Sequence, residues 1–332
     1  MARVLFLTFY LCRHGHKLFG PLDWEELTDS IHLMRSNFLK ALLTSLLLLS
    51  AFCSAEVVNS KCQLISGSIA LDEGAIKYLS VGSGKPVLLL HGLFAQKEQW
   101  SDFACELSKG GYLVYAPDLP GYGQSVGFVI ANYQLSSEVN LIHQFTQKLG
   151  LKKFNIAGNS MGGTIAALLA QQYPKEVNTL AFIGPPLGIV GWSPQVKAAI
   201  YQGINPFIPI TVDQFNLEMG LLFSKSPVID NSIKEAAVKE FSVNNRHYQQ
   251  VWNIVNLDIA VLDSISNLRK PTFIIWGQDD GIFSASGKPK LDKKYPNAIS
   301  STLTGASHLI MIEKPIEVAD LYKGFLKASS PK

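Results

Sequence analysis

"FNIAGNSMGGTIAALLAQQ", residues 154–172, is the stretch of this 332-residue chain that decides its fold. Its first part is a short apolar run ending in glycine, which is typical of a buried β-strand. Its second part is a longer run of small and apolar residues, which indicates an α-helix. Between the two lies Gly158-Asn159-Ser160-Met161-Gly162, so that a serine occupies the sharp corner where a strand turns directly into a helix.

This corner predicts that Ser160 is a nucleophile. A G-x-S-x-G sequence between a strand and a helix holds a serine hydroxyl on a strained turn, and a plain glycine-rich turn is the alternative interpretation. Gly158 and Gly162 leave room for the turn, because a side chain at either position would clash with the neighbouring strand or helix. The N-terminus of the following helix supplies free N–H groups and a positive dipole end beneath the serine.

The rest of the chain repeats the strand-then-helix rhythm around this corner. Apolar runs that end in glycine or proline predict buried strands at residues 86–92, 112–116, 154–160, 178–186 and 271–277. Amphipathic stretches predict helices at 100–109, 134–149 and 161–172. This alternation predicts an α/β domain with a mostly parallel sheet over residues 56–332. The rhythm is lost at residues 187–268, which we expect to form a helical cap inserted after the sixth strand.

The base that activates Ser160 is predicted to be His308. A serine hydroxyl is a weak nucleophile until a base takes its proton, and the chain beyond its N-terminal segment offers His91, His143, His247 and His308. His143 falls within a predicted helix and His247 within the cap. His308 follows a glycine-containing loop after the last strand, and its place near the C-terminus fits the order serine, acid, histidine. A surface histidine is the alternative.

The acid that orients the histidine is predicted to be Asp280. The sequence "WGQDDGIFS", residues 276–284, places two carboxylates at the end of a buried strand. Asp280 follows Trp276 by the usual offset of four residues, and Asp279 is the second choice. Such a carboxylate holds the imidazole in one tautomer and stabilises its charged form.

Two backbone N–H groups are expected to bind the oxyanion that forms during acyl transfer. One is that of Met161, directly after the nucleophile. The other belongs to the turn after residues 86–91, where Leu93 is the first choice and Phe94 the second. His91, at the start of that turn, is interpreted as a structural residue that holds the loop.

The N-terminal 55 residues read as a leader. An apolar stretch, residues 41–55, follows Arg35 and Lys40 and ends in small residues, which is typical of a secretory signal with an apolar region of about 7–15 residues. A membrane-spanning helix needs about 20 residues, so an uncleaved anchor is the less favoured alternative. The signal is complete from Met34 onward, which suggests that translation starts there. We therefore expect an exported protein, periplasmic or secreted.

Composition excludes several other classes of protein. The net charge is +3 and no run of Lys and Arg stands out, so nucleic acid is not an expected partner. No spacing of His, Cys and carboxylates is typical of a metal site. Cys62 and Cys105 remain after removal of the leader, and they form either a disulfide or two buried thiols.

Five motifs in a fixed order resemble the α/β-hydrolase superfamily: "HGLFAQKEQW" (91–100), "DLPGYGQS" (118–125), "GNSMGG" (158–163), "WGQDD" (276–280) and "GASHLIMIEKP" (305–315). The first, with Lys97 and Trp100, looks like that of the bacterial family V lipases and the related monoacylglycerol lipases. The resemblance implies the α/β-hydrolase fold, no cofactor, and ester hydrolysis on acylglycerols or similar lipids. Leu93 stands where many members have phenylalanine, and Ser286 where proline is common.

The resemblance leaves several functions open. A serine esterase or lipase that works through an acyl-enzyme is the favoured function. A carbon–carbon bond hydrolase of the meta-cleavage-product type shares the "GNSMGG" motif, and an acyltransferase differs only in its acceptor. A non-catalytic binding module on this scaffold is the alternative outside enzymes. We expect a monomer that acts on small-molecule or lipid esters, and transient contact with a membrane or lipid surface is compatible with that.

The cap is expected to set substrate specificity. Its apolar side chains either pack the cap onto the core or line a mainly hydrophobic acyl pocket, and we expect both: Trp192, Phe207, Phe215, Met219, Leu221, Leu222, Phe223 and Trp252. Arg246 and His247 are its polar exceptions.

Overall fold

The computed structural model describes residues 62–259, 261 and 268–329, and those from Leu64 onward belong to one compact unit. The predicted leader, residues 1–55, and the predicted start at Met34 lie outside the described residues. Among the described residues, no helix combines the length and the apolar character that a membrane crossing requires.

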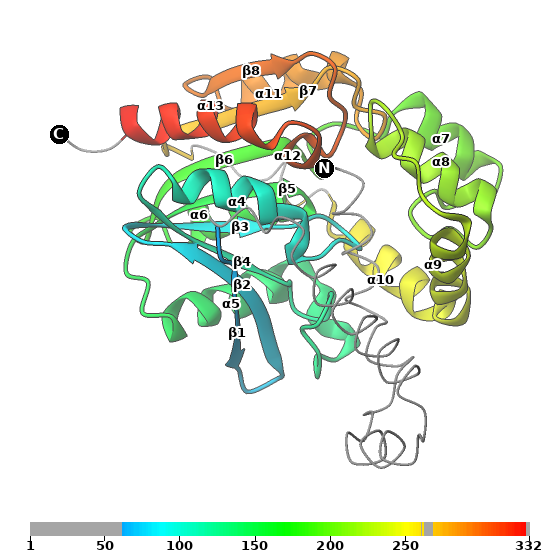
Figure 1. Ribbon diagram of the computed structural model, residues 1–332, viewed down its shortest axis with the longest axis horizontal. Coiled ribbons are helices and arrows are strands. Elements are labelled where there is room, and N and C mark those ends of the chain that lie inside the picture. Colours follow the sequence, from blue (N-terminus) through cyan, green and yellow to red (C-terminus); the bar gives the residue numbers. More distant parts are fainter. Residues whose placement is uncertain (1–61, 260, 262–267, 330–332) are drawn as a thin grey trace, which may run out of the picture. The chain divides into compact units, whose positions relative to one another are not determined.

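An eight-stranded sheet forms the centre of this unit, in the order β1-β2-β4-β3-β5-β6-β7-β8 (Figure 1). The first two strands pair antiparallel, and β2 also pairs antiparallel with β4, whereas all pairs from β4 to β8 are parallel. The bounds are β1 Ile65–Ala70, β2 Ala75–Gly82, β3 Lys85–Leu90, β4 Tyr112–Pro117, β5 Phe154–Ser160, β6 Val177–Pro186, β7 Thr272–Gly277 and β8 Ile299–Leu303.

The central strands are apolar because both of their faces are covered. Every residue of β5 and of β7 is buried, which is why their sequences show no alternation of polar and apolar residues. Helix α4 packs against α13, and α5 packs against α6. Their bounds are α4 Ser101–Ser108, α5 Leu135–Lys148, α6 Met161–Gln172 and α13 Pro315–Ala328. The predicted α/β-hydrolase architecture is confirmed.

Among the described residues between β6 and β7, four α-helices lie together at one end of the sheet (Figure 1). They are α7 Pro194–Tyr201, α8 Val212–Leu222, α9 Asn231–Val243 and α10 Asn245–Leu257. We call these helices and their connections the cap. The shorter elements are η1 Lys97–Trp100, η2 Ile130–Tyr133, η4 Ala285–Gly287, α11 Lys288–Lys294 and α12 Ile310–Glu313.

Candidate active site

Ser160 lies at the predicted corner in a strained backbone conformation. It is the last residue of β5, it has φ 52° and ψ −121°, and α6 begins at the next residue. A positive φ at a residue with a side chain costs about 1–3 kcal/mol and persists only where the surroundings impose it. A Cβ on Gly158 would overlap the backbone of Gly162, and one on Gly162 would overlap the carbonyl oxygens of Leu90 and His91. The two glycines are therefore required by the packing of α6 against β5 and β3.

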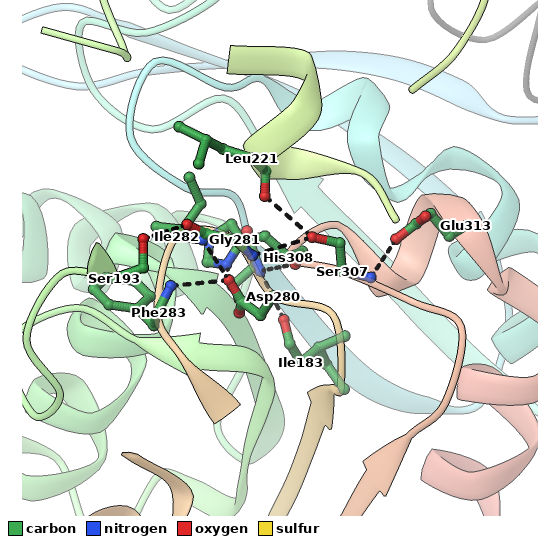
Figure 2. Close-up of polar contacts among 11 residues, drawn as sticks. Ile183, Ser193, Leu221, Asp280, Gly281, Ile282, Phe283, Ser307, His308 and Glu313 are labelled. Carbon is green, nitrogen blue, oxygen red and sulfur yellow. Dashed lines mark hydrogen bonds and ion pairs between the residues drawn. The ribbon is translucent and has the colours of Figure 1, made fainter. Parts of the chain in front are cut away.

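Asp280 and His308 form a buried pair (Figure 2). The Nδ1 atom of His308 lies 3.0 Å from Oδ2 of Asp280. The other carboxylate oxygen, Oδ1, accepts hydrogen bonds from the backbone N–H groups of Ile282 and Phe283, each at 2.9 Å. With Nδ1–H donating to the carboxylate, Nε2 is the ring nitrogen that is left to act as a base. Asp279 is exposed, and of the two candidate acids it is Asp280 that pairs with His308.

Asn159 connects the serine corner to the histidine loop. Its Nδ2 donates to the carbonyl oxygen of Ile183 at 2.8 Å and to that of His308 at 3.2 Å. The residue before the nucleophile is thus hydrogen bonded to the backbone of the candidate base. Sequence reasoning assigned no role to Asn159. The available signal was its residue type. Asn159 is a carboxamide at a buried position, where a polar side chain needs hydrogen-bond partners.

The turn after β3 lies directly beside Ser160. A Cβ on Gly92 would be 3.4 Å from Cβ of Ser160, and Phe94 has a left-handed φ of 56°. Met161 is the first residue of α6, so its N–H is among those that the helix leaves unpaired at its start. Leu93 and Met161 stay the predicted oxyanion donors.

His91 holds this turn in place. Its Nδ1–H donates to the carbonyl oxygen of Gly92 at 2.8 Å, and its Nε2 accepts from the N–H of Leu119 at 2.9 Å. Complete burial lowers the pKa of His91 to about 4. The ring is therefore neutral at physiological pH with both nitrogens in use, as its interpretation as a structural residue requires.

An ion pair connects the first two sequence motifs, residues 91–100 and 118–125. Nζ of Lys97 lies 2.8 Å from Oδ2 of Asp118, and the backbone N–H of Lys97 donates to Oδ1 at 2.8 Å. The N–H of Gln124 also donates to Oδ2, at 2.8 Å. Because Lys97 and Asp118 are both buried, the pair and these backbone bonds together fix the loop after β4 against the segment after β3.

The aromatic side chains of the cap divide into two groups. Phe215, Met219 and Phe223 are buried in a cluster of cap residues, and Leu309 and Ile312 pack against this cluster. Trp192, Phe207 and Trp252 are half-buried. Trp252 stacks on both of the others, the rings of Trp192 and Phe207 are tilted, and Trp192 also stacks on Phe283 with ring centroids 5.0 Å apart. The ring of Phe283 lies 5.7 Å from that of His308. We call Trp192, Phe207, Trp252 and Phe283 the aromatic cluster.

His247 is exposed and lies against Tyr133 of η2. Its Nε2 lies 3.2 Å from the hydroxyl of Tyr133, which donates to the carbonyl oxygen of Gly121 at 2.8 Å. Helix α10 thus contributes Trp252 to the aromatic cluster and places His247 against η2.

Cys62 and Cys105 are both disulfide-bonded. The alternative of two buried free thiols is therefore wrong. Among the residues that the structure describes, no group of three or more His, Cys, Asp and Glu side chains could hold a metal ion.

Residues 85–315 match the model of the α/β-hydrolase-fold family, so the chain belongs to that family. It is 28% identical over 279 residues to monoacylglycerol lipase abhd6-B of Xenopus laevis, covering 77% of this chain and 80% of that protein. It is 27% identical over 252 residues to Lipase 1 of Psychrobacter immobilis, covering 73% and 77%. A solved membrane phospholipase A, described as a bacterial virulence factor, superposes with a TM-score of 0.75 at 26% identity, covering 88% and 96%.

Proposed function

We propose that this chain is a serine hydrolase that cleaves carboxylic esters of lipophilic compounds through an acyl-enzyme. The observation that carries the proposal is the buried hydrogen bond from His308 to Asp280, in a loop that Asn159 ties to the strained corner at Ser160. An imidazole oriented by a carboxylate is the base that a serine hydroxyl needs. The relatives named as lipases support an ester as the substrate.

The chemistry follows from these positions. Nε2 of His308 takes the proton of Ser160 as Oγ attacks the ester carbonyl, and Asp280 stabilises the imidazolium. The N–H groups of Met161 and Leu93 bind the oxyanion. The C–O bond to the alcohol breaks, and the alcohol leaves with the proton from His308. Water, deprotonated by His308, then attacks the acyl-enzyme, releasing the acid and returning the proton to Ser160.

The aromatic cluster supports a lipophilic substrate. Three of its four side chains are half-buried although they are apolar, and the fourth, Phe283, contacts His308. Apolar surface that stays partly open beside a catalytic group is typical of a substrate-binding wall. An acyl chain or an apolar alcohol that lies against this wall would bring its ester group to His308.

The test is Ser160→Ala with a fluorophosphonate probe and a series of p-nitrophenyl esters of increasing chain length. We expect the variant to lose all labelling and about four to six orders of magnitude in kcat. Ser284→Ala is the matched control, because the Ser284 hydroxyl hydrogen bonds to Ser286 in the loop after the acid. Hydrolysis by Ser160→Ala at the parental rate would refute the proposal, and a preference for long chains over acetate would support the lipophilic substrate.

We further propose that the protein is exported. The leader-like residues 34–55 and the disulfide-bonded state of Cys62 and Cys105 support this, because disulfides persist in oxidising compartments. Cell fractionation with thiol titration tests it: a cytosolic protein with free thiols would contradict export.

A further inference from the structure

The loop that carries His308 is hydrogen bonded on both sides of the histidine to cap helix α8. The hydroxyl of Ser307 donates to the carbonyl oxygen of Leu221 at 3.1 Å (Figure 2). The N–H of Leu309 donates to the carbonyl oxygen of Leu222 at 3.2 Å. These carbonyls belong to the last turn of α8, where they have no partner within the helix. The candidate base is therefore flanked by two bonds to the cap.

Glu313 adds a second connection between the same two segments. Its Oε2 accepts the N–H of Ser307 at 2.6 Å, directly before His308. Its Oε1 accepts both the N–H of Ser224 at 2.8 Å and the hydroxyl of Ser224 at 2.6 Å, just after α8 ends. The Ser224 hydroxyl also lies 3.4 Å from the carbonyl oxygen of Gly305, which is the longer contact. One carboxylate thus accepts three hydrogen bonds, two from the cap and one from the histidine loop.

These bonds are stronger than those between neutral groups. A carboxylate acceptor shortens a hydrogen bond and makes it roughly twice as strong as a neutral pair. Glu313 is half-buried, so water competes with the three donors only in part. The position of residue 307, and with it the direction in which the neighbouring imidazole points, depends on where the end of α8 lies.

We propose that Glu313 is a positioning residue that fixes the loop of His308 against the cap. The position of the cap then determines how the imidazole of His308 is oriented. The inference rests on the proposed function, because it assigns His308 the role of general base. Glu313 contacts neither the serine corner nor the aromatic cluster through any hydrogen bond that the described residues show. Its removal is therefore expected to impair the chemical step and to spare substrate binding.

The experiment compares Glu313→Ala and Glu313→Gln with the parent protein. In Glu313→Gln the shape is kept, but the amide turns one acceptor into a donor that faces a donor. We expect kcat to fall about 10- to 100-fold in Glu313→Ala and about tenfold in Glu313→Gln, the loss that misplacement of a catalytic group causes. KM stays near the parental value. The rate of fluorophosphonate labelling falls by a similar factor, because the same base serves that reaction.

Two further variants separate positioning from general destabilisation. Asp320→Asn removes the same charge from a solvent-facing carboxylate of α13, which pairs with Lys323, and kcat is expected to stay unchanged. Ser224→Ala removes one bond of the connection and is expected to lower kcat several-fold. In the Glu313→Ala background it should add no further loss, because the short bond from the hydroxyl to Glu313 is already gone; independent effects would multiply.

Parental kcat in a folded Glu313→Ala protein, or a multiplying effect of Ser224→Ala, overturns the inference. If Glu313→Ala does not fold, Glu313→Gln and Ser224→Ala decide: parental kcat and labelling rate in both overturn it. These outcomes differ from failure of the proposed function, in which the parent protein itself is not labelled at Ser160.

Discussion

Glu138 is expected to make the folded protein lose stability as the pH rises. It lies on α5 with no exposed surface, and neither of its carboxyl oxygens has a hydrogen-bond partner among the described residues. Burial raises the pKa of Glu138 well above the ordinary range. The folded protein therefore keeps a proton on this carboxyl that the unfolded chain releases above about pH 4.3. Because the unfolded state then binds fewer protons, stability falls with rising pH until the folded pKa is reached.

The magnitude follows from this difference in proton binding. Each pH unit between the two pKa values costs about 1.4 kcal/mol, so the parent loses up to about 2.7 kcal/mol from this one group between about pH 5 and about pH 7. Glu138→Leu and Glu138→Gln both remove the titrating group. Relative to the parent, each variant should therefore gain stability by that amount over the same pH interval. Glu138→Leu should gain about 1–3 kcal/mol more than Glu138→Gln at both pH values, because it also removes the buried unpaired polar group.

Urea unfolding followed by tryptophan fluorescence, at both pH values, measures these differences. The comparison between parent and variant cancels every other titrating group that the substitution leaves unchanged. A stability difference of the same size at both pH values would refute the reasoning, since it would mean that Glu138 does not hold its proton in the folded state.

Two further predictions concern the turn after β3 and the aromatic cluster. The pKa of His91, lowered by burial to about 4, means that the unfolded chain gains a proton below about pH 6.5 that the folded protein refuses. Stability falls as the pH drops, by about 2 kcal/mol between about pH 6.5 and about pH 4.5, and urea unfolding of His91→Gln should lack this loss. Trp252→Ala opens the aromatic cluster, so kcat/KM for long-chain p-nitrophenyl esters should fall about 10- to 100-fold while that for acetate stays unchanged. An equal fall for both esters would mean that Trp252 serves only the packing of the cap.

The elements around the serine could be predicted from the sequence because their signals are local. The predicted helix at 161–172 coincides with α6, and the run at 86–92 overlaps β3, since strands buried on both faces show as continuous apolar runs. Strand β1 was not predicted. Its sequence, ISGSIA, is short and half exposed, and it is a strand only because β2 pairs with it antiparallel. Such an edge strand leaves little signal in composition.

The candidate site could be predicted only where the chemistry dictates a residue type. The serine was predicted from the G-x-S-x-G motif, and the histidine from the chain order serine, acid, histidine. Asp280 was preferred to Asp279 because of its offset of four residues from Trp276. Asn159 and Glu313 could not be found in this way. Each hydrogen bonds to the backbone of a segment that is remote in sequence: Asn159 to the carbonyl oxygen of His308, and Glu313 to the N–H of Ser224. Nothing near either residue in the sequence indicates that partner.

The types of the three residues that hold the loops follow from how deeply each is buried. His91 and Asn159 are buried, and both are neutral there, because an unpaired charge at such depth costs more than its hydrogen bonds return. Glu313 is only half-buried, so a full charge there loses less hydration. With three donors the carboxylate also forms stronger hydrogen bonds than a neutral group. A neutral amide at position 313 could accept from one segment but not from both. The carboxylate is therefore the one side chain of this length that can join the histidine loop to the cap, which is why Glu313→Gln, with its shape unchanged, is the more demanding test of that role.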